Sequence, residues 1–130
     1  MLSSLRKICK LFIKFTSWNK CSKAEHLITQ YPECIMPWQK AFEEASQNKS
    51  YSACNWLYTK AKNNNISIDI HFQNDKFILE LCKYGYLDNI TIIIQWDKEY
   101  PWLAKLEGIL ETLHNKERIV DIIKQNTILE

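Results

Sequence analysis

The stretch that decides the fold is ISIDIHFQNDKFILELCKYGYLDNITIII, residues 66–94. Its first five residues alternate between isoleucine and polar side chains, a period of two that predicts a half-buried extended segment. Asn74 and Asp75 then supply a helix start, because Asn tolerates a left-handed backbone and both side chains accept hydrogen bonds from first-turn N–H groups. Gly85 predicts the end of that helix, since glycine readily takes the positive φ needed just past a last turn.

The apolar positions of this stretch predict two short helices that need neighbours. Phe77, Ile78, Leu81 and Cys82 fall on one face of the first helix. The second helix, from Leu87 to Ile94, is apolar on most of its sides. Such a helix must be covered by other elements, and one helix pair cannot cover it alone. The stretch therefore predicts further helix pairs stacked on it, as in repeat proteins.

A weaker copy of the same unit lies upstream, between Lys40 and Lys60. Phe42 falls on Ile78 and Leu57 falls on Ile93 without a gap, both at an offset of 36 residues. Self-similarity near this period is typical of solenoids built from helix pairs.

The two copies resemble ankyrin repeats, most closely the divergent, Asn- and Ile-rich repeats common in large DNA viruses of amoebae. Those read roughly I-x-I-H-x-x-N-D-x-A-F-x-x-A-C-x-x-G-H-L-x-x-A-x-W-L-Y. The Thr-Pro-Leu-His tetrapeptide of standard ankyrin repeats is replaced by Lys-Phe-Ile-Leu at 76–79, and the glycine expected near Lys49 is missing. The resemblance covers roughly residues 38–96. The matching residues are Ile68, Ile70, His71, Asn74, Asp75, Cys82, Gly85 and Leu87 in one copy, and Ala41, Phe42, Ala45, Trp56, Leu57 and Tyr58 in the other.

Composition and resemblance together predict an all-α fold. Two glycines and three prolines in 130 residues leave few helix breakers, and this length suits a single domain, residues 1–130. The resemblance implies a short stack of antiparallel helix pairs, an ankyrin-like solenoid with degenerate capping repeats and one extended loop finger near residues 62–74. The expected parts are an N-terminal cap or decayed repeat at 2–30, repeats at 38–61 and 66–96, and a C-terminal cap at 102–126.

The resemblance also implies a function, which is binding of another protein through the concave side of the solenoid. In ankyrin repeats the loop fingers and the first helix of each pair build that side. Phe72 is the expected aromatic anchor at the finger tip, unless it packs under the neighbouring finger. The residues carried over from the family pattern are Glu43, Glu44, Gln47, Asn64, Asn65, Phe72, Gln73, Glu80, Lys83 and Tyr84.

The N-terminal segment has an unusual charge pattern. Before Glu25 there are six basic residues and no acidic one, whereas the remainder carries eleven basic and fifteen acidic residues. Residues 2–15 place apolar side chains at helical spacing, with Arg6, Lys7, Lys10 and Lys14 on the other face. Two interpretations fit this pattern. The helix either caps the stack with its apolar face, or it is a basic amphipathic helix that contacts an anionic membrane surface or serves as a targeting presequence.

The sequence gives no sign of catalysis or of a cofactor. It contains no phosphate-binding glycine loop, no nucleophile elbow and no H-E-x-x-H motif, so we expect neither an enzyme nor a small-molecule substrate. Cys21, His26 and Cys34 fit no usual zinc spacing, so no metal site is expected. His71 is expected to bond loop backbone or Asp69 and to fix the turn.

The remaining composition bears on location and partners. Five cysteines without a C-x-x-C pair favour a reducing compartment, in which Cys54 and Cys82 are buried as small apolar residues. The longest apolar runs are too short for a membrane span. We therefore expect an intracellular, cytoplasmic protein, in the host cytoplasm if it is viral. A net charge of +2 is too small to favour nucleic acid as the partner.

Overall fold

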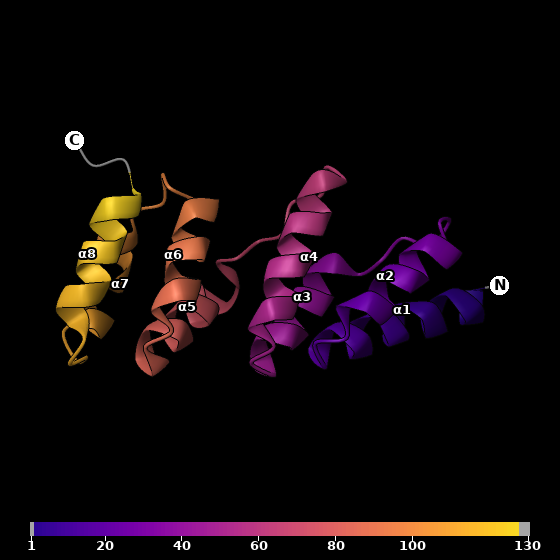
Figure 1. Cartoon of the computed structure of the whole chain (residues 1–130), viewed down its shortest axis with the longest axis horizontal. Coiled ribbons are helices and arrows are strands. Elements are labelled where there is room, and N and C mark those ends of the chain that lie inside the picture. The colour runs from indigo at the N-terminus through magenta and orange to yellow at the C-terminus, as the bar shows by residue number, and fades with distance from the viewer. Residues whose placement is uncertain (1, 128–130) are drawn as a thin grey trace. The chain divides into compact units, whose positions relative to one another are not determined.

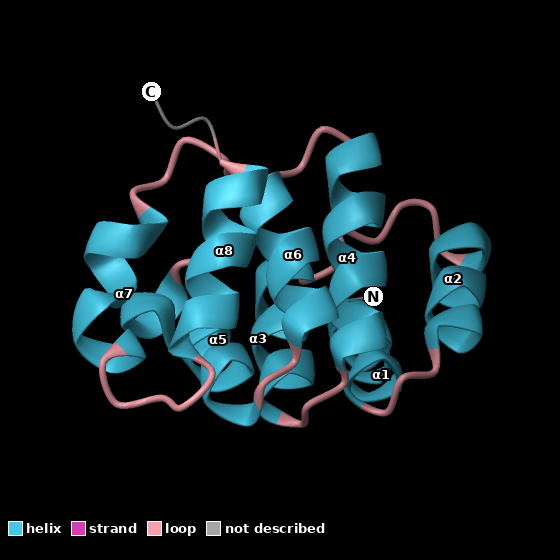
Figure 2. Cartoon of the chain, turned by 60° about the vertical axis from the view of Figure 1, so that its left-hand side comes forward, coloured by secondary structure: helices cyan, strands magenta, loops and turns pink. Residues whose placement is uncertain are grey.

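The computed structural model describes residues 2–127, with side chains described from residue 4 onward. The prediction of an all-α fold is confirmed, because this part of the chain contains helices and no strand (Figure 2). The helices form two compact units, a unit that ends at Ile70 and a unit that begins at His71, here called the N-terminal and C-terminal units. The helices, labelled in Figure 1, are α1 (Leu2–Ser17), α2 (Cys21–Gln30), α3 (Trp38–Gln47), α4 (Tyr51–Asn63), α5 (Phe72–Tyr84), α6 (Leu87–Trp96), α7 (Trp102–Leu110) and α8 (Lys116–Asn126).

Consecutive helices pack as pairs, and the pairs pack on each other within each unit. In the N-terminal unit α1 contacts α2 and α3 contacts α4, while α1 also lies against α3 and α4. In the C-terminal unit α5 contacts α6 and α7 contacts α8, while α6 lies against α8 and α5 against α7. Each unit thereby has its own apolar core.

The α1–α2, α3–α4 and α5–α6 connections share one backbone geometry. Each contains one residue with a left-handed backbone: Asn19 at φ 59°, Lys49 at φ 58° and Gly85 at φ 72°. The N–H of that residue donates to the carbonyl three residues earlier, and the next N–H donates to the carbonyl five residues earlier. This pattern is the Schellman ending, which pairs otherwise unsatisfied last-turn carbonyls and reverses the chain. The predicted helix stop at Gly85 is confirmed.

The two copies found in the sequence have the same local structure. Lys49 and Gly85 are 36 residues apart, and so are the first residues of the helices that follow, Tyr51 of α4 and Leu87 of α6. Aligned apolar positions share the same environment, since Phe42 and Ile78, and likewise Leu57 and Ile93, are buried. Lys49 takes the left-handed conformation in place of the missing glycine.

An aromatic cluster holds the core of the N-terminal unit. Phe12 of α1 meets the Trp38 ring edge-on at a centroid distance of 5.2 Å, and Trp56 lies 6.3 Å from Phe12 and 6.5 Å from Trp38. Ile8 and Phe12 are buried, whereas the basic residues on the other face of α1 are exposed. The apolar side of α1 thus covers α3 and α4, as the capping interpretation requires. The exposed basic residues are Arg6, Lys7, Lys10 and Lys14.

The loop finger begins later than the predicted span of 62–74, because Lys62 and Asn63 belong to the end of α4. The asparagine run at 63–65 marks the C-terminus of that helix. At the other end α5 begins at Phe72, but Gln73, Asn74 and Asp75 have a left-handed backbone, so regular α-helix starts only after Asp75. Asn65 ends α4 with the same left-handed geometry, at φ 61°.

The predicted alternation within this loop is confirmed. Ile68 and Ile70 are buried, while Ser67 and Asp69 are exposed. The Gln39 side chain of α3 holds the loop backbone through two hydrogen bonds. Its amide nitrogen donates to the Asp69 carbonyl at 3.0 Å, and its amide oxygen accepts the Asp69 N–H at 2.8 Å. The half-buried isoleucines and this reciprocal pair fix an extended segment that has no sheet partner.

Buried thiols occupy the positions expected for small packing residues. Cys54 and Cys82 are buried, whereas Cys9, Cys21 and Cys34 are partly exposed. Burial raises the pKa of the Cys82 thiol to about 12 and also raises the pKa of Cys54, because an apolar environment disfavours the thiolate. No helix in the described residues is long and apolar enough to cross a membrane.

The left-handed backbone at Gly85 and Lys49 predicts that removing a glycine and introducing one change the free energy of unfolding in opposite directions. Gly85→Ala is expected to lower the free energy of unfolding by about 1 kcal/mol, because alanine is strained at positive φ. Its Cβ would also lie 3.3 Å from Asn115 Nδ2. Lys49→Gly is expected to raise the free energy of unfolding by about 0.5 to 1 kcal/mol, because glycine removes the strain. Urea unfolding followed by circular dichroism measures both, and a change of the same sign at the two positions would contradict the shared geometry.

Candidate interaction groove

A groove between α5 and α7 is lined by several of the predicted binding residues. It has a volume of about 650 Å³ and lies wholly within the C-terminal unit. Leu79 of α5 and Leu113, just beyond α7, form an apolar floor, together with Ile109, which is 39% exposed. Polar side chains lie around this floor. The lining residues are Gln73, Asn74, Lys76, Leu79, Glu80, Lys83, Ile109, Thr112 and Leu113.

The rim of the groove carries an excess of positive charge. Lys76 and Lys83 flank Glu80 along α5, four residues before it and three residues after it. Both lysines are exposed, and neither has a hydrogen bond or an ion pair within the described residues. An apolar floor beside two unpaired ammonium groups suits a ligand that combines apolar side chains with a negative charge.

One end of the groove is a strained turn. Gln73, Asn74 and Asp75 are all left-handed, with φ values of 52°, 56° and 63°. L-amino acids usually enter this region singly, because each such residue costs about 1 to 2 kcal/mol. Gln73 and Asn74 line the groove, and the regular part of α5 begins only after Asp75. Strained backbone of this kind persists where the surroundings fix it, and it is commonly found at binding sites.

A polar and aromatic cluster fixes that turn. His71 Nδ1 lies 2.5 Å from Asp75 Oδ1, and His71 Nε2 lies 2.8 Å from Asp97 Oδ2. Tyr100 donates its hydroxyl proton to Asp75, and its ring stacks on the imidazole at a centroid distance of 3.7 Å. Trp102 Nε1 donates to the Asp97 carbonyl at 2.7 Å. The cluster therefore ties the first turn of α5 to the α6–α7 connection.

The surroundings of His71 favour its charged form. Burial alone would lower the pKa of His71, but hydrogen bonds to Asp97 and Asp75 and their negative charges outweigh burial and raise it. With a carboxylate at each ring nitrogen, only the protonated imidazole can donate to both. The sequence predicted a turn-fixing role for His71 through loop backbone or Asp69, whereas these two carboxylates are the partners that raise its pKa.

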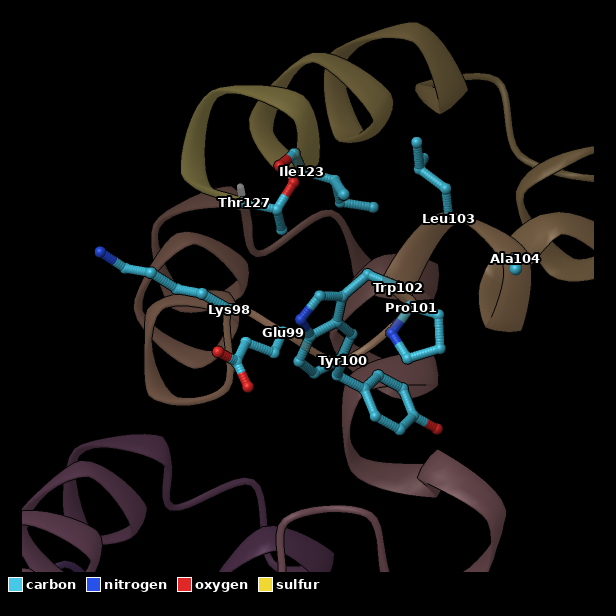
Figure 3. Close-up of a pocket in the computed structure, with 9 residues that line it drawn as sticks. All are labelled: Lys98, Glu99, Tyr100, Pro101, Trp102, Leu103, Ala104, Ile123 and Thr127. Carbon is cyan, nitrogen blue, oxygen red and sulfur yellow. Dashed lines mark hydrogen bonds between the residues drawn. The ribbon is translucent and has the colours of Figure 1, made fainter. Parts of the chain in front are cut away.

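A second hollow lies where the α6–α7 connection meets the end of α8. Figure 3 shows Tyr100 and Trp102 below Ile123 and Thr127, with the Lys98 side chain directed away. Its volume is about 440 Å³. The lining brings together no set of polar groups aimed at a common point, so we assign it no chemistry.

Several predicted binding residues lie at the groove. Gln73, Glu80 and Lys83 line it, whereas Tyr84 is exposed at the end of α5 and faces Tyr86 at a centroid distance of 6.2 Å. Three of the residues predicted for the first helix of a repeat and its loop therefore lie on one wall of the groove, and their role in binding stays a prediction.

The predicted residues of the N-terminal unit stay separate from this groove. Glu43 and Glu44 are partly exposed on α3, and Gln47 is exposed at its end. Asn64 and Asn65 are exposed in the turn after α4. The hollow between α1 and α2 and the small hollow beside Tyr58 and Ile66 are lined by other residues of this unit.

The prediction that Phe72 is an aromatic anchor for a partner is contradicted by the structure. Phe72 is buried, with 8% of its surface exposed, and so leaves no area for a partner. It is the first residue of α5, and its ring is buried. The interpretation of Phe72 as an exposed anchor is therefore wrong.

The α7 wall was not predicted as part of a site. Trp102, Leu106 and Leu110 recur every four residues and fill the core. Ile109 and Leu113 form a second apolar stripe beside it, which lines the groove. The second stripe can be seen in the sequence. The stripe of Trp102, Leu106 and Leu110 is enough to form the buried face of α7, so Ile109 and Leu113 are apolar residues that this face does not require.

The function cannot be assigned from a metal centre or from a known relative. Within the described residues no three His, Cys, Asp or Glu side chains are grouped so that they could hold a metal ion. Comparison with protein families, with curated proteins and with solved structures gave no match. Function is therefore inferred from the residues and their geometry.

The His71 cluster predicts a pH-dependent stability. Its folded pKa lies above the ordinary value of 6.5, so the stabilisation is complete below that value and is lost as pH rises through the folded pKa. The free energy of unfolding of the wild type should fall over that window, and His71→Gln should remove this part of the dependence. Urea unfolding across neutral pH measures it, and identical pH dependences of the two proteins would contradict the assignment.

Proposed function

We propose that the chain is an ankyrin-like helical repeat module that binds another protein and performs no catalysis. The repeated helix pair with its 36-residue spacing supports the repeat assignment. The groove between α5 and α7 supports the binding assignment, since first helices of successive pairs form its walls. This groove is the single observation that carries the proposal.

The chemistry of the groove specifies the segment that it binds. Leu79, Ile109 and Leu113 offer an apolar strip, which favours a ligand with apolar side chains along one face. Lys76 and Lys83 favour acidic groups beside those side chains. We therefore expect an acidic amphipathic segment of a partner protein.

The lining residues favour binding over bond-making chemistry. The hydroxyl group of Thr112 donates to the Ile109 carbonyl at 2.7 Å, so it is not directed at a base. Glu80 is partly exposed between two lysines. Catalytic groups usually depend on burial and on a hydrogen-bonded partner that shifts their pKa.

The remaining expectations follow from the same proposal. The buried thiols of Cys54 and Cys82 suit a reducing, cytoplasmic location, because both act as packing residues. If the protein is viral, as its likeness to viral ankyrin repeats suggests, this cytoplasm is that of the host cell.

The groove predicts which peptides the protein selects. A displayed library of random short peptides, panned on the purified protein, should yield sequences with spaced apolar residues and acidic neighbours. Fluorescence polarisation of a selected peptide should then show about three- to tenfold weaker binding to Lys83→Glu, because a rim attraction becomes a repulsion. Ile109→Asp should weaken binding tenfold or more, since burying isoleucine contributes about 1.5 to 3 kcal/mol.

The matched control is Lys124→Glu, which makes the same charge change on the exposed side of α8. It should bind the peptide as the wild type does, apart from a small general charge effect. Equal weakening by Lys124→Glu and Lys83→Glu, or full binding by Ile109→Asp, would refute the groove as the binding site.

A further inference from the structure

The exposed side of α1 and the turn after it form a second surface, unrelated to the groove. The chain has no acidic residue before Glu25, and every basic residue of that segment is exposed. The segment therefore presents one sign of charge to the solvent. These residues are Arg6, Lys7, Lys10, Lys14, Lys20 and Lys23.

A large aromatic side chain is exposed among these basic residues. Trp18, in the α1–α2 turn, is 54% exposed. Lys14 Nζ lies 4.9 Å and Lys20 Nζ lies 5.4 Å from the centroid of its ring. Tryptophan flanked by lysines suits a membrane–water boundary, because the indole ring prefers the interface and the ammonium groups reach the lipid phosphates.

Apolar surface continues from Trp18 along α1. Lys7, Leu11, Lys14 and Trp18 follow at spacings of four, three and four residues, which places them on one side of the helix. Leu11 is 40% exposed, although a leucine in a packed helix is normally covered.

An open groove between α1 and α2 adjoins this stripe. It has a volume of about 550 Å³, and its apolar walls include Ile8, Leu11, Phe15 and Leu27. Lys23 stands at its edge, with Nζ 5.7 Å from the Phe15 ring centroid.

The core of the unit limits how such a helix meets a membrane. Phe12 is fully buried and packs against Trp38, so the inner side of α1 is already used in the fold. Insertion through that side would require α1 to leave the core. Contact through the outer side leaves the fold intact and sets α1 along the membrane plane.

We propose that this surface docks the protein on a membrane that contains anionic lipid. The basic residues bind the headgroups, while Trp18 and Leu11 enter the interfacial layer. The groove beside this charge favours lipid over nucleic acid, because Ile8, Leu11 and Leu27 add aliphatic walls to its aromatic ones, and aliphatic side chains offer no ring on which a base could stack. This docking is independent of peptide binding in the α5–α7 groove.

The experiment is co-sedimentation of the full chain with vesicles of phosphatidylcholine containing about 30% phosphatidylserine, compared with pure phosphatidylcholine. The wild type should bind the anionic vesicles, less at high salt. Lys7→Glu together with Lys10→Glu should weaken binding about 25-fold or more, since each lysine near an anionic surface contributes about fivefold. Both lysines are exposed, so circular dichroism should show an unchanged fold.

Two controls separate the surface from general charge. Lys98→Glu together with Lys124→Glu makes the same charge change in the C-terminal unit and should keep vesicle binding. Brominated phosphatidylcholine, mixed into the anionic vesicles, should quench the tryptophan fluorescence of the wild type more than that of Trp18→Phe.

Three outcomes would overturn the proposal. One is the absence of anionic-vesicle binding at low salt. Another is equal binding by the Lys7/Lys10 and Lys98/Lys124 variants. The third is that the wild type binds duplex DNA or RNA more tightly than the vesicles and that the Lys7/Lys10 variant no longer binds the nucleic acid. This result would assign the surface to nucleic acid.

Discussion

The reversal of the chain at one left-handed residue is the constraint on which the rest of the structure depends. Asn19, Lys49 and Gly85 each end one helix and start the next within a few residues. So short a connection lays the second helix back along the first, and the two apolar faces then form a core. If the turn were longer or differently shaped, the apolar faces of the two helices, which carry Phe42 and Leu57 in one pair and Ile78 and Ile93 in the other, would not be held together in this way.

A polar side chain early in the first helix of each aligned copy holds the loop that follows the pair. Gln39 binds the backbone of Asp69, and Asp75, which is 36 residues later, accepts the hydroxyl proton of Tyr100. In the C-terminal unit this contact belongs to the His71 cluster, which also fixes the left-handed turn at the end of the groove. Packing, hydrogen bonding and the groove are therefore linked through one short segment.

The sequence predicted the helices well because their signals are local. Apolar spacing, the glycine at position 85 and the isoleucine alternation depend on residues within a few turns of each other. The left-handed turn at Lys49 was not predicted, because no glycine marks it, although Lys49 lies 36 residues before Gly85.

The site was less predictable because its contacts join distant residues. Asp75 looked like a helix cap, yet it is buried beside Tyr100, which lies 25 residues later. Asp97 binds His71, which lies 26 residues earlier, and no local pattern predicts this contact. The position of Phe72 next to the loop allowed either an exposed anchor or a packed ring, and only the three-dimensional structure shows that it is buried. The α7 wall needed the packing of α5 against α7, which no local pattern contains.

The backbone at Lys49 tests the account most directly, because it is where a repeat was inferred without its usual glycine. Backbone NMR chemical shifts and the HN–Hα coupling constant report φ for each residue in solution. The account predicts a positive φ at Lys49, matching Gly85, with helical shifts on both sides of each residue. An ordinary right-handed helical φ at Lys49, with helical shifts running unbroken from α3 into α4, would contradict it.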